Sequence, residues 1–265
     1  MQPTALVLDG CQHELDDLGV ALMRRVSRRL RAHFGQTPCP RPIPEGPHFV
    51  YENAPHLFGQ RTGRGPLHVM LDTNVFLDLA DRARSIWLED IEVDSKYGEE
   101  LEALQLFMGL WVIRDIRLHL PEALRWDSRS ILSEKRRAER RRAIREFDLA
   151  LQLVGEFDVN RQDRIGAYRV LNRLLERVPA GGDRSIAREA MNSGMHVVLT
   201  RDEGFLKAKA SLRVVGIMVA SPQDLLEMLV AAGAFHCLLR PECAYWPLPD
   251  QHRTSHLARL AQMMV

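Results

Sequence analysis

The chain has 265 residues, of which 46% are hydrophobic and 27% are charged, as in ordinary soluble globular proteins. This length suits one large domain or one domain with appendages. A formal net charge of +1 excludes a globally basic nucleic-acid-binding protein, so any basic surface must be local.

The sequence also argues against membrane and secreted proteins. No apolar run reaches membrane-spanning length, and the acidic residues near the N-terminus are unlike those of a signal peptide. Four cysteines lie near the two ends of the chain, with neither a Cys-x-x-Cys pair nor a metal-ligand spacing: Cys11, Cys39, Cys237 and Cys243. Reduced thiols are the default for this pattern. We therefore expect a cytoplasmic protein without membrane contact.

Residues 1–66 form a predicted N-terminal extension. Apolar residues between Leu15 and Leu30 recur at helical spacing, which predicts one amphipathic helix of about twenty residues. This helix can dock on the core, dimerise or bind a partner protein, and docking is the commonest outcome. The prolines from Pro38 to Pro47 then predict an extended segment, followed by a glycine-rich approach to the core.

Residues 67–233 alternate between predicted strands and helices, an order typical of a parallel, doubly wound α/β sheet. The five expected strands are residues 69–71, 117–120, 156–159, 197–199 and 213–219. A long helical region, with an acidic loop at residues 89–94, follows the first strand, and Ser221-Pro222 begins the last helix. Residues 234–265 form a C-terminal extension whose pattern indicates no function.

The stretch between residues 125 and 145 is strongly basic. It carries nine cations against three acids, and five arginines are candidates for nucleic-acid contact: Arg136, Arg137, Arg140, Arg141 and Arg142. A basic stripe on a helix can track phosphates, and arginine suits bidentate phosphate contacts. The alternative, a solvated helix face, has equal weight.

Carboxylates follow two of the predicted strands. An Asp-Thr-Asn sequence starting at Asp72 comes directly after residues 69–71, and a Thr-Arg-Asp sequence ending at Asp202 comes after residues 197–199. Open α/β sheets bind ligands at the carboxyl ends of their strands, so acids in these positions are candidates for metal binding. A third acid, Asp183, is predicted to cap a later helix. Each of the three also suits a purely structural cap or turn.

Three short motifs resemble those of the PIN-domain nucleases: Leu-Asp-Thr-Asn-Val-Phe at 71–76, a helix start at 183–190, and Val-Leu-Thr-Arg-Asp-Glu-Gly-Phe at 198–205. The family has an Asp-Thr/Ser-Asn opening, an Asp at the start of a later helix and an Asp after the fourth strand. The resemblance covers about residues 67–228. It implies an α/β/α sandwich with a five-stranded parallel sheet in the order 3-2-1-4-5 and a helical, arginine-rich insertion.

The resemblance also implies a metal site. Four acids would hold Mg²⁺ or Mn²⁺: Asp72, Asp127, Asp183 and Asp202. Asp127 stands where the family usually has a glutamate, and its shorter side chain weakens its assignment as a ligand. Glu122 and Glu134 rank behind Asp127 for this position.

Polar residues beside these acids have expected roles as well. Thr73 and Asn74 would orient water or hold the loop, and Thr200 and Arg201 could contact phosphate. Two neighbouring acids are expected to be surface or capping residues: Asp78 and Glu203.

Together these features predict a metal-dependent endoribonuclease, toxin-like or RNA-processing, that acts on transfer or ribosomal RNA. The main alternative is a PIN-like RNA-binding or scaffold protein with weak or no catalysis, which the aspartate at position 127 favours. A phosphatase with Asp72 as nucleophile is disfavoured, because Asn74 cannot protonate a leaving group. The expected partners are RNA, a second copy of the chain, and an antitoxin or other protein bound through residues 1–66.

Overall fold

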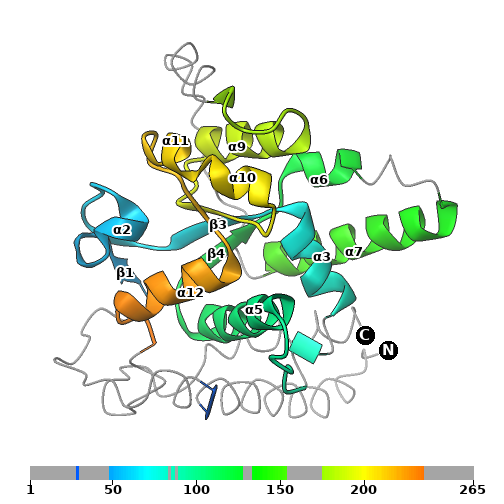
Figure 1. Cartoon of the computed structure of the whole chain (residues 1–265), viewed down its shortest axis with the longest axis horizontal. Coiled ribbons are helices and arrows are strands. Elements are labelled where there is room, and N and C mark those ends of the chain that lie inside the picture. Colours follow the sequence, from blue (N-terminus) through cyan, green and yellow to red (C-terminus); the bar gives the residue numbers. More distant parts are fainter. Residues whose placement is uncertain are drawn as a thin grey trace, which may run out of the picture.

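A parallel sheet of four strands lies at the centre of the molecule (Figure 1). The computed structural model describes residues 28–29, 48–82, 85–86, 89–127, 133–153 and 175–235. The strands, in their order across the sheet, are β4 (Ile116–His119), β3 (Leu67–Leu71), β5 (Val197–Leu199) and β6 (Met218–Ala220). The prediction of a parallel α/β sheet is confirmed for these strands. The remaining predicted strand, at residues 156–159, lies outside the described residues.

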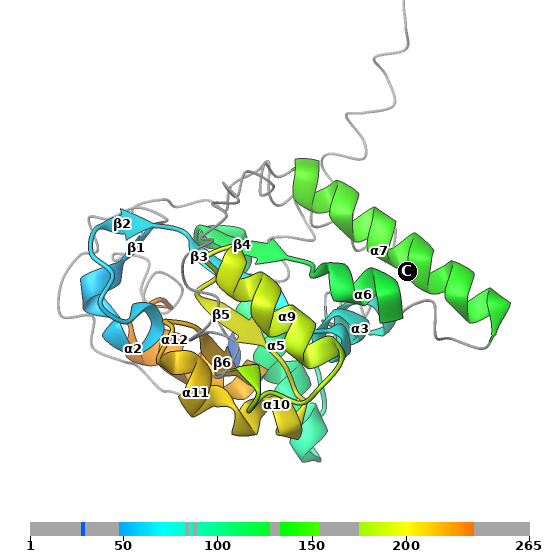
Figure 2. The ribbon, with the colours of Figure 1, turned by 90° about the horizontal axis from the view of Figure 1, so that it is seen from above.

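Helices cover both faces of this sheet (Figures 1 and 2). Helices α3, α5, α7 and α12 pack on one face, and α9, α10 and α11 pack on the other, while α6 contributes to both cores. The helical elements are η1 (Tyr51–Asn53), α2 (Pro55–Phe58), α3 (Thr73–Asp81), α5 (Lys96–Ile113), α6 (Glu122–Asp127), α7 (Glu134–Leu153), α9 (Gly182–Asn192), α10 (Glu203–Lys207), α11 (Lys209–Arg213) and α12 (Pro222–Ala231).

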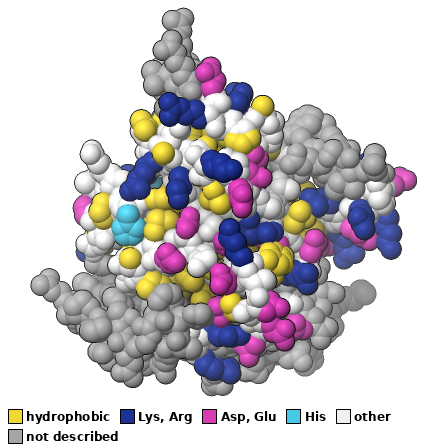
Figure 3. Space-filling model, in the orientation of Figure 1, with side chains coloured by type: hydrophobic (Ala, Val, Ile, Leu, Met, Phe, Trp, Pro, Cys, Tyr) yellow, Lys and Arg dark blue, Asp and Glu magenta, His cyan; other side chains and the backbone are white. Residues whose placement is uncertain are grey.

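The surface of the described residues is mixed in charge and suits a chain of near-zero net charge. Basic and acidic side chains intermingle over α9 to α12 in the face shown in Figure 3. None of the described helices is long and apolar enough to span a membrane.

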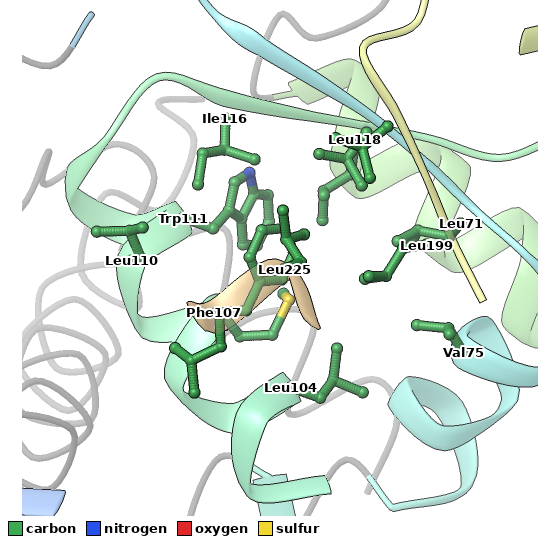
Figure 4. Packing of buried hydrophobic residues seen from close by; sticks show 14 of the residues in the cluster. Leu71, Val75, Leu104, Phe107, Leu110, Trp111, Ile116, Leu118, Leu199 and Leu225 are labelled. Atoms are coloured by element: carbon green, nitrogen blue, oxygen red, sulfur yellow. The ribbon is translucent and has the colours of Figure 1, made fainter. Parts of the chain in front are cut away.

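The larger core lies between the sheet and α5. Trp111 and Phe107 on this helix are almost completely buried, and they meet Leu118 of β4 and Leu225 of α12 (Figure 4). Full burial of one such side chain contributes about 1.5–3 kcal/mol to stability. Because α5 is apolar on most sides, it packs against both the sheet and the neighbouring helix α12.

The packed domain begins before residue 67. A two-stranded antiparallel unit of β1 (Phe49–Val50) and β2 (Arg64–Gly65) precedes β3, and it encloses η1 and α2. Phe49 and Phe58 precede the predicted glycine-rich approach and are buried in the larger core. Arg64 and Gly65, within that approach, form β2. Upstream, the Arg29 guanidinium donates a hydrogen bond of 2.8 Å to the Ile91 carbonyl. The rest of the predicted N-terminal helix lies outside the described residues.

Several predicted boundaries differ from the structure. Residues 213–219 are not one strand, because α11 continues to Arg213 and a turn at Gly216, with φ of 80°, delays β6 until Met218. The helical region after β3 is divided into α3 and α5, and the Ser95 side chain caps α5 by accepting from the Gly98 amide. Ser221 caps α12 as predicted.

Three histidines meet on the sheet face opposite α5. His68 Nδ1 lies 3.0 Å from His119 Nε2, and the His68 amide donates to His196 Nδ1 at 2.9 Å. The His196 ring packs edge-on against Phe58 at 5.1 Å between centroids. The pKa of His68 is lowered to about 4, and the pKa values of His119 and His196 are lowered to about 3. Burial is the largest cause in all three cases. The positive charge of Arg61 lowers the pKa of His196 further.

The histidine cluster makes stability depend on pH. Each unfolded histidine takes up a proton near pH 6.5, whereas the folded ones resist protonation until about pH 4 or 3. The free energy of unfolding should therefore be highest above pH 6.5. Below that pH it should fall by about 1.4 kcal/mol per pH unit for each histidine, until the pH reaches the pKa of that histidine in the folded protein. Urea denaturation at a series of pH values measures this slope. His119→Gln should make the slope shallower, and an unchanged slope would contradict this account of the cluster.

Candidate functional site

Asp72 stands at the junction of the central strand and its helix. It follows β3 directly, is only 4% exposed, and caps α3 by accepting a hydrogen bond of 2.6 Å from the Thr73 amide. Its own amide donates to the Leu199 carbonyl at 2.9 Å, which extends the pairing of β3 with β5 by one step. The local sequence, an apolar strand followed by a capping residue, therefore places a carboxylate at the edge of the sheet.

Asn74 and Thr200 hold this carboxylate from two chain segments. The Thr200 hydroxyl donates to Asp72 Oδ2 at 2.5 Å, and Asn74 Nδ2 donates to the same oxygen at 2.7 Å. Asn74 Oδ1 accepts from the Arg201 amide at 2.9 Å. The ends of the adjacent strands β3 and β5 are thus joined by side chains as well as by the sheet, and Asp72 has a fixed orientation.

Asp202 lies at the same edge of the sheet. Its amide donates to the Thr200 hydroxyl oxygen at 3.0 Å, and its side chain caps α10 by accepting from the Phe205 amide at 2.8 Å. A Cβ at Gly204 would lie 2.9 Å from Asp202 Oδ1, so a larger residue there would displace the carboxylate. Thr200 therefore connects the two aspartates that the sequence motifs single out.

The environment of Asp72 disfavours its charged form. Burial is the largest cause of its raised pKa, and the nearby charge of Asp202 raises the pKa further. The hydrogen bonds from Thr200, Thr73 and Asn74 act in the opposite direction, because they stabilise the carboxylate. Two carboxylates that interact in this way gain from a cation placed between them.

The other predicted acids lie at the ends of helices. Asp183 lies in the first turn of α9 and is not the helix cap, because Gly181 occupies that position with φ of 107°. Asp127 is the last residue of α6, and its side chain lies outside the described part of the chain. Glu122 and Glu134 begin α6 and α7, and both are exposed. The structure thus joins Asp72 and Asp202 and leaves the four-acid set a prediction.

A metal ion is compatible with this pair of acids. Among the described residues, no group of three or more His, Cys, Asp or Glu side chains is arranged to hold a metal. Magnesium, however, is often bound through one or two carboxylates and keeps several waters. Asp202 is exposed, and its Oδ1 and Asp72 Oδ1 each accept one backbone hydrogen bond, which leaves acceptor capacity on both carboxylates.

Arg201, which is partly exposed, forms an ion pair with the buried Asp78 beside the site. Arg201 Nε lies 2.6 Å from Asp78 Oδ2, and Arg201 Nη2 donates to Asp78 Oδ1 at 2.9 Å. Tyr97 donates to the same carboxylate at 2.8 Å, and its ring centroid lies 4.7 Å from the Arg201 guanidinium. The prediction that Asp78 is a surface or capping residue is wrong, because it is only 5% exposed.

The ion pair and the Asp72 network involve two residues with a predicted phosphate contact. Arg201 binds Asp78 through Nε and Nη2, and Thr200 is fully buried with its hydroxyl on Asp72. Phosphate contact by either residue stays a prediction. The spacing of Asn74 and Asp78 is a sequence signal for a shared partner, because residues four apart lie on one face of a helix. Asn74 accepts a hydrogen bond from the Arg201 amide, and Asp78 accepts one from the Arg201 side chain.

The five candidate arginines lie on α7. Ile144, Phe147 and Leu151 bury one face of this helix, and the Phe147 ring packs edge-on against Phe76 of α3 at 5.6 Å. The arginines on the remaining faces differ in exposure: Arg136, Arg141 and Arg142 are exposed, and Arg137 and Arg140 are half-buried. Basic side chains gather over α7 at the right of Figure 3.

Removing Arg201 tests the buried pair. Arg201→Met should lower the free energy of unfolding by about 3 kcal/mol, because Asp78 is then left buried without its cation. Adding Asp78→Asn, which keeps an acceptor for Tyr97, should recover most of this loss. Denaturant unfolding of the two single variants and the double variant gives the coupling energy. A double variant whose loss equals the sum of the two single losses would show that the pair carries no coupling energy.

The chain was compared with protein-family models, curated proteins and solved structures. None of the three comparisons gave a match.

Proposed function

We propose that the protein is a PIN-like, metal-dependent endoribonuclease that acts in the cytoplasm. The observation that carries this proposal is the joining of Asp72 and Asp202, through Thr200, at the carboxyl ends of adjacent parallel strands. This edge is where open α/β sheets bind their ligands. Two interacting carboxylates, held in fixed orientation, match the chemistry of a site for Mg²⁺ or Mn²⁺.

The proposed reaction is the hydrolysis of an RNA phosphodiester. A divalent cation at this edge would neutralise charge on the phosphate and lower the pKa of an attacking water. Asp72 and Asp202 would hold it, with Asp183 and Asp127 as further ligands. Asn74 and Thr200 act through Asp72, since their hydrogen bonds fix the direction of its carboxylate.

The proposal includes a complete PIN-like sheet in the order 3-2-1-4-5. The order β4-β3-β5-β6 agrees with the last four places of that series. The predicted strand at residues 156–159 would then lie beside β4. The arginines of α7 would track the backbone of a transfer or ribosomal RNA, while residues 1–66 remain the proposed contact for a second copy or a partner protein.

A second candidate is a PIN-like RNA-binding protein without catalysis. Asp72 already accepts three hydrogen bonds, and the described residues contain no group of three metal-ligating side chains. Such a site could be purely structural. In that case α7 would bind RNA, and the acids would only hold the ends of β3 and β5 together.

Substitution of the two joined acids separates these candidates. Asp72→Asn and Asp202→Asn should each reduce Mn²⁺-dependent cleavage of labelled RNA by on the order of 100-fold, because each removes a proposed metal ligand while keeping the side-chain shape. Glu203→Gln is the matched control, since Glu203 is an exposed neighbour in the first turn of α10.

Metal binding by the folded variants completes this test. Calorimetric titration of Mn²⁺ should show weaker binding to Asp72→Asn and Asp202→Asn than to Glu203→Gln, with circular dichroism confirming that all three fold. Cleavage that survives EDTA, or that is equal in all variants, would rule out the proposed metal site. Tight RNA binding without cleavage by the unaltered chain would establish the second candidate.

Charge reversal on α7 tests the RNA surface. Arg136→Glu with Arg141→Glu should weaken binding of labelled transfer RNA in EDTA, and the slope of log K against log salt should fall by about 1 for each phosphate contact removed. Arg188→Glu changes an exposed arginine on α9 and serves as the control. If the two changes affect binding equally, α7 is a solvated face and not an RNA surface.

A further inference from the structure

A groove opens between α11 and α12, next to β6. It is lined by residues of both helices, by two residues of β6 and by His56 of α2. The helices α2, α11 and α12 lie together on one side of the molecule (Figures 1 and 2). The volume of the groove is about 460 Å³, which is within the range of small-molecule binding sites.

Two long-range hydrogen bonds hold the segments around the groove in place. His56 Nε2 donates to the Met228 carbonyl of α12 at 3.0 Å, which joins residues 172 positions apart. Arg61 Nη1 donates to the Gly216 carbonyl at 3.2 Å, in the turn between α11 and β6. The segment around α2 is thus tied to both α12 and the start of β6. The groove is therefore preformed, as most small-molecule sites are.

The floor of the groove is apolar. Met218 and Met228 are half-buried, Ala231 is exposed, and Val219 is buried with only 1% of its surface accessible. Methionine side chains adapt to apolar groups of different shapes. An apolar part of a ligand would therefore contact side chains here, chiefly those of the two methionines.

The two sides of the groove carry opposite charges. Lys209 and Arg213 are four residues apart on α11, and Asp224 and Glu227 are three apart on α12, so each pair shares one helix face. Helix α11 packs on one face of the sheet and α12 on the other. In the described part of the chain, these cations and acids form no ion pairs with each other. A ligand in the groove could therefore bind to both sides at once.

From this arrangement we infer that the groove binds a small zwitterion with an apolar body, which is the chemistry of a free apolar amino acid or of a short peptide with unblocked ends. Its carboxylate would bind to Lys209 and Arg213 on α11. Its ammonium group would bind to Asp224 and Glu227 on α12. Its apolar body would lie between these two ends, over the methionines of the floor.

Other classes of ligand match these features less well. A phosphate compound would be repelled by the acids of α12, and a polyamine would be repelled by the cations of α11. A neutral apolar molecule would displace water from charged side chains without giving them a partner. The inference does not depend on the proposed nuclease activity, because the groove lies beside β6, and β5 separates that strand from Asp72 at the end of β3.

Calorimetric titration of the full chain with related ligands tests the inference. The probes are leucine and the tripeptide leucyl-alanyl-leucine, whose extended chain spans at most about 10 Å. Acetylation of the amino end or amidation of the carboxyl end should weaken binding of the tighter probe by about tenfold or more, because each removes one charge. The corresponding glycine compound keeps both charges and should also bind about tenfold more weakly, because it lacks the apolar side chains.

Two double variants assign the ends of the ligand to the sides of the groove. Lys209→Gln with Arg213→Gln should weaken binding of the free probe, and the remaining binding should no longer respond to amidation. Asp224→Asn with Glu227→Gln should instead make binding insensitive to acetylation. Lys207→Gln, at an exposed site on α10 outside the groove, is the control and should keep both responses. Circular dichroism confirms that each variant folds.

The relative affinity of the two probes identifies the source of the ligand. Tighter binding of leucine points to a free amino acid, and tighter binding of the tripeptide points to a short peptide. The inference is overturned if neither probe binds at millimolar concentration, or if blocked or glycine compounds bind as tightly as the free leucine compounds. It is also overturned if the two double variants bind all compounds as the control does, because the binding site then lies outside the groove.

Discussion

The hydrogen bond from Thr200 to Asp72 joins residues that are 128 positions apart, and the candidate site depends on it. It forms because β3 and β5 are adjacent and parallel, so that their carboxyl ends meet at one edge. The apolar residues of both strands are buried between two helical layers, which fixes this register. The core thereby positions a polar network that no local sequence feature could hold in place.

Local patterns predicted much of this arrangement. The strands at residues 69–71 and 197–199 and the caps at Asp72 and Ser221 are encoded by a few neighbouring residues, and the structure confirms them. The start of β6 was not predictable in this way, because the predicted strand at 213–219 begins with the last residue of α11 and a turn at 214–216. Periodicity alone does not distinguish short apolar helices from strands.

Most contacts between residues far apart in the chain could not be predicted from the sequence. The four-residue spacing of Asn74 and Asp78 indicates a shared helix face but not the partner, and only the fold shows that Arg201 pairs with Asp78. His68, His119 and His196 come from three separate segments, and only the strand order β4-β3-β5 brings them together. The motifs placed Asp72 and Asp202 after two strands, and the structure shows that these strands are neighbours. The contribution of more distant acids stays a prediction.

The pairing of β3 with β5 also has a consequence for how the protein is made. During synthesis, the central strand emerges long before its second neighbour, so one of its edges stays unpaired until residue 199 has left the ribosome. Contacts of this sequence separation form late in folding. The nascent chain therefore carries no assembled acidic pair until Asp202 has left the ribosome.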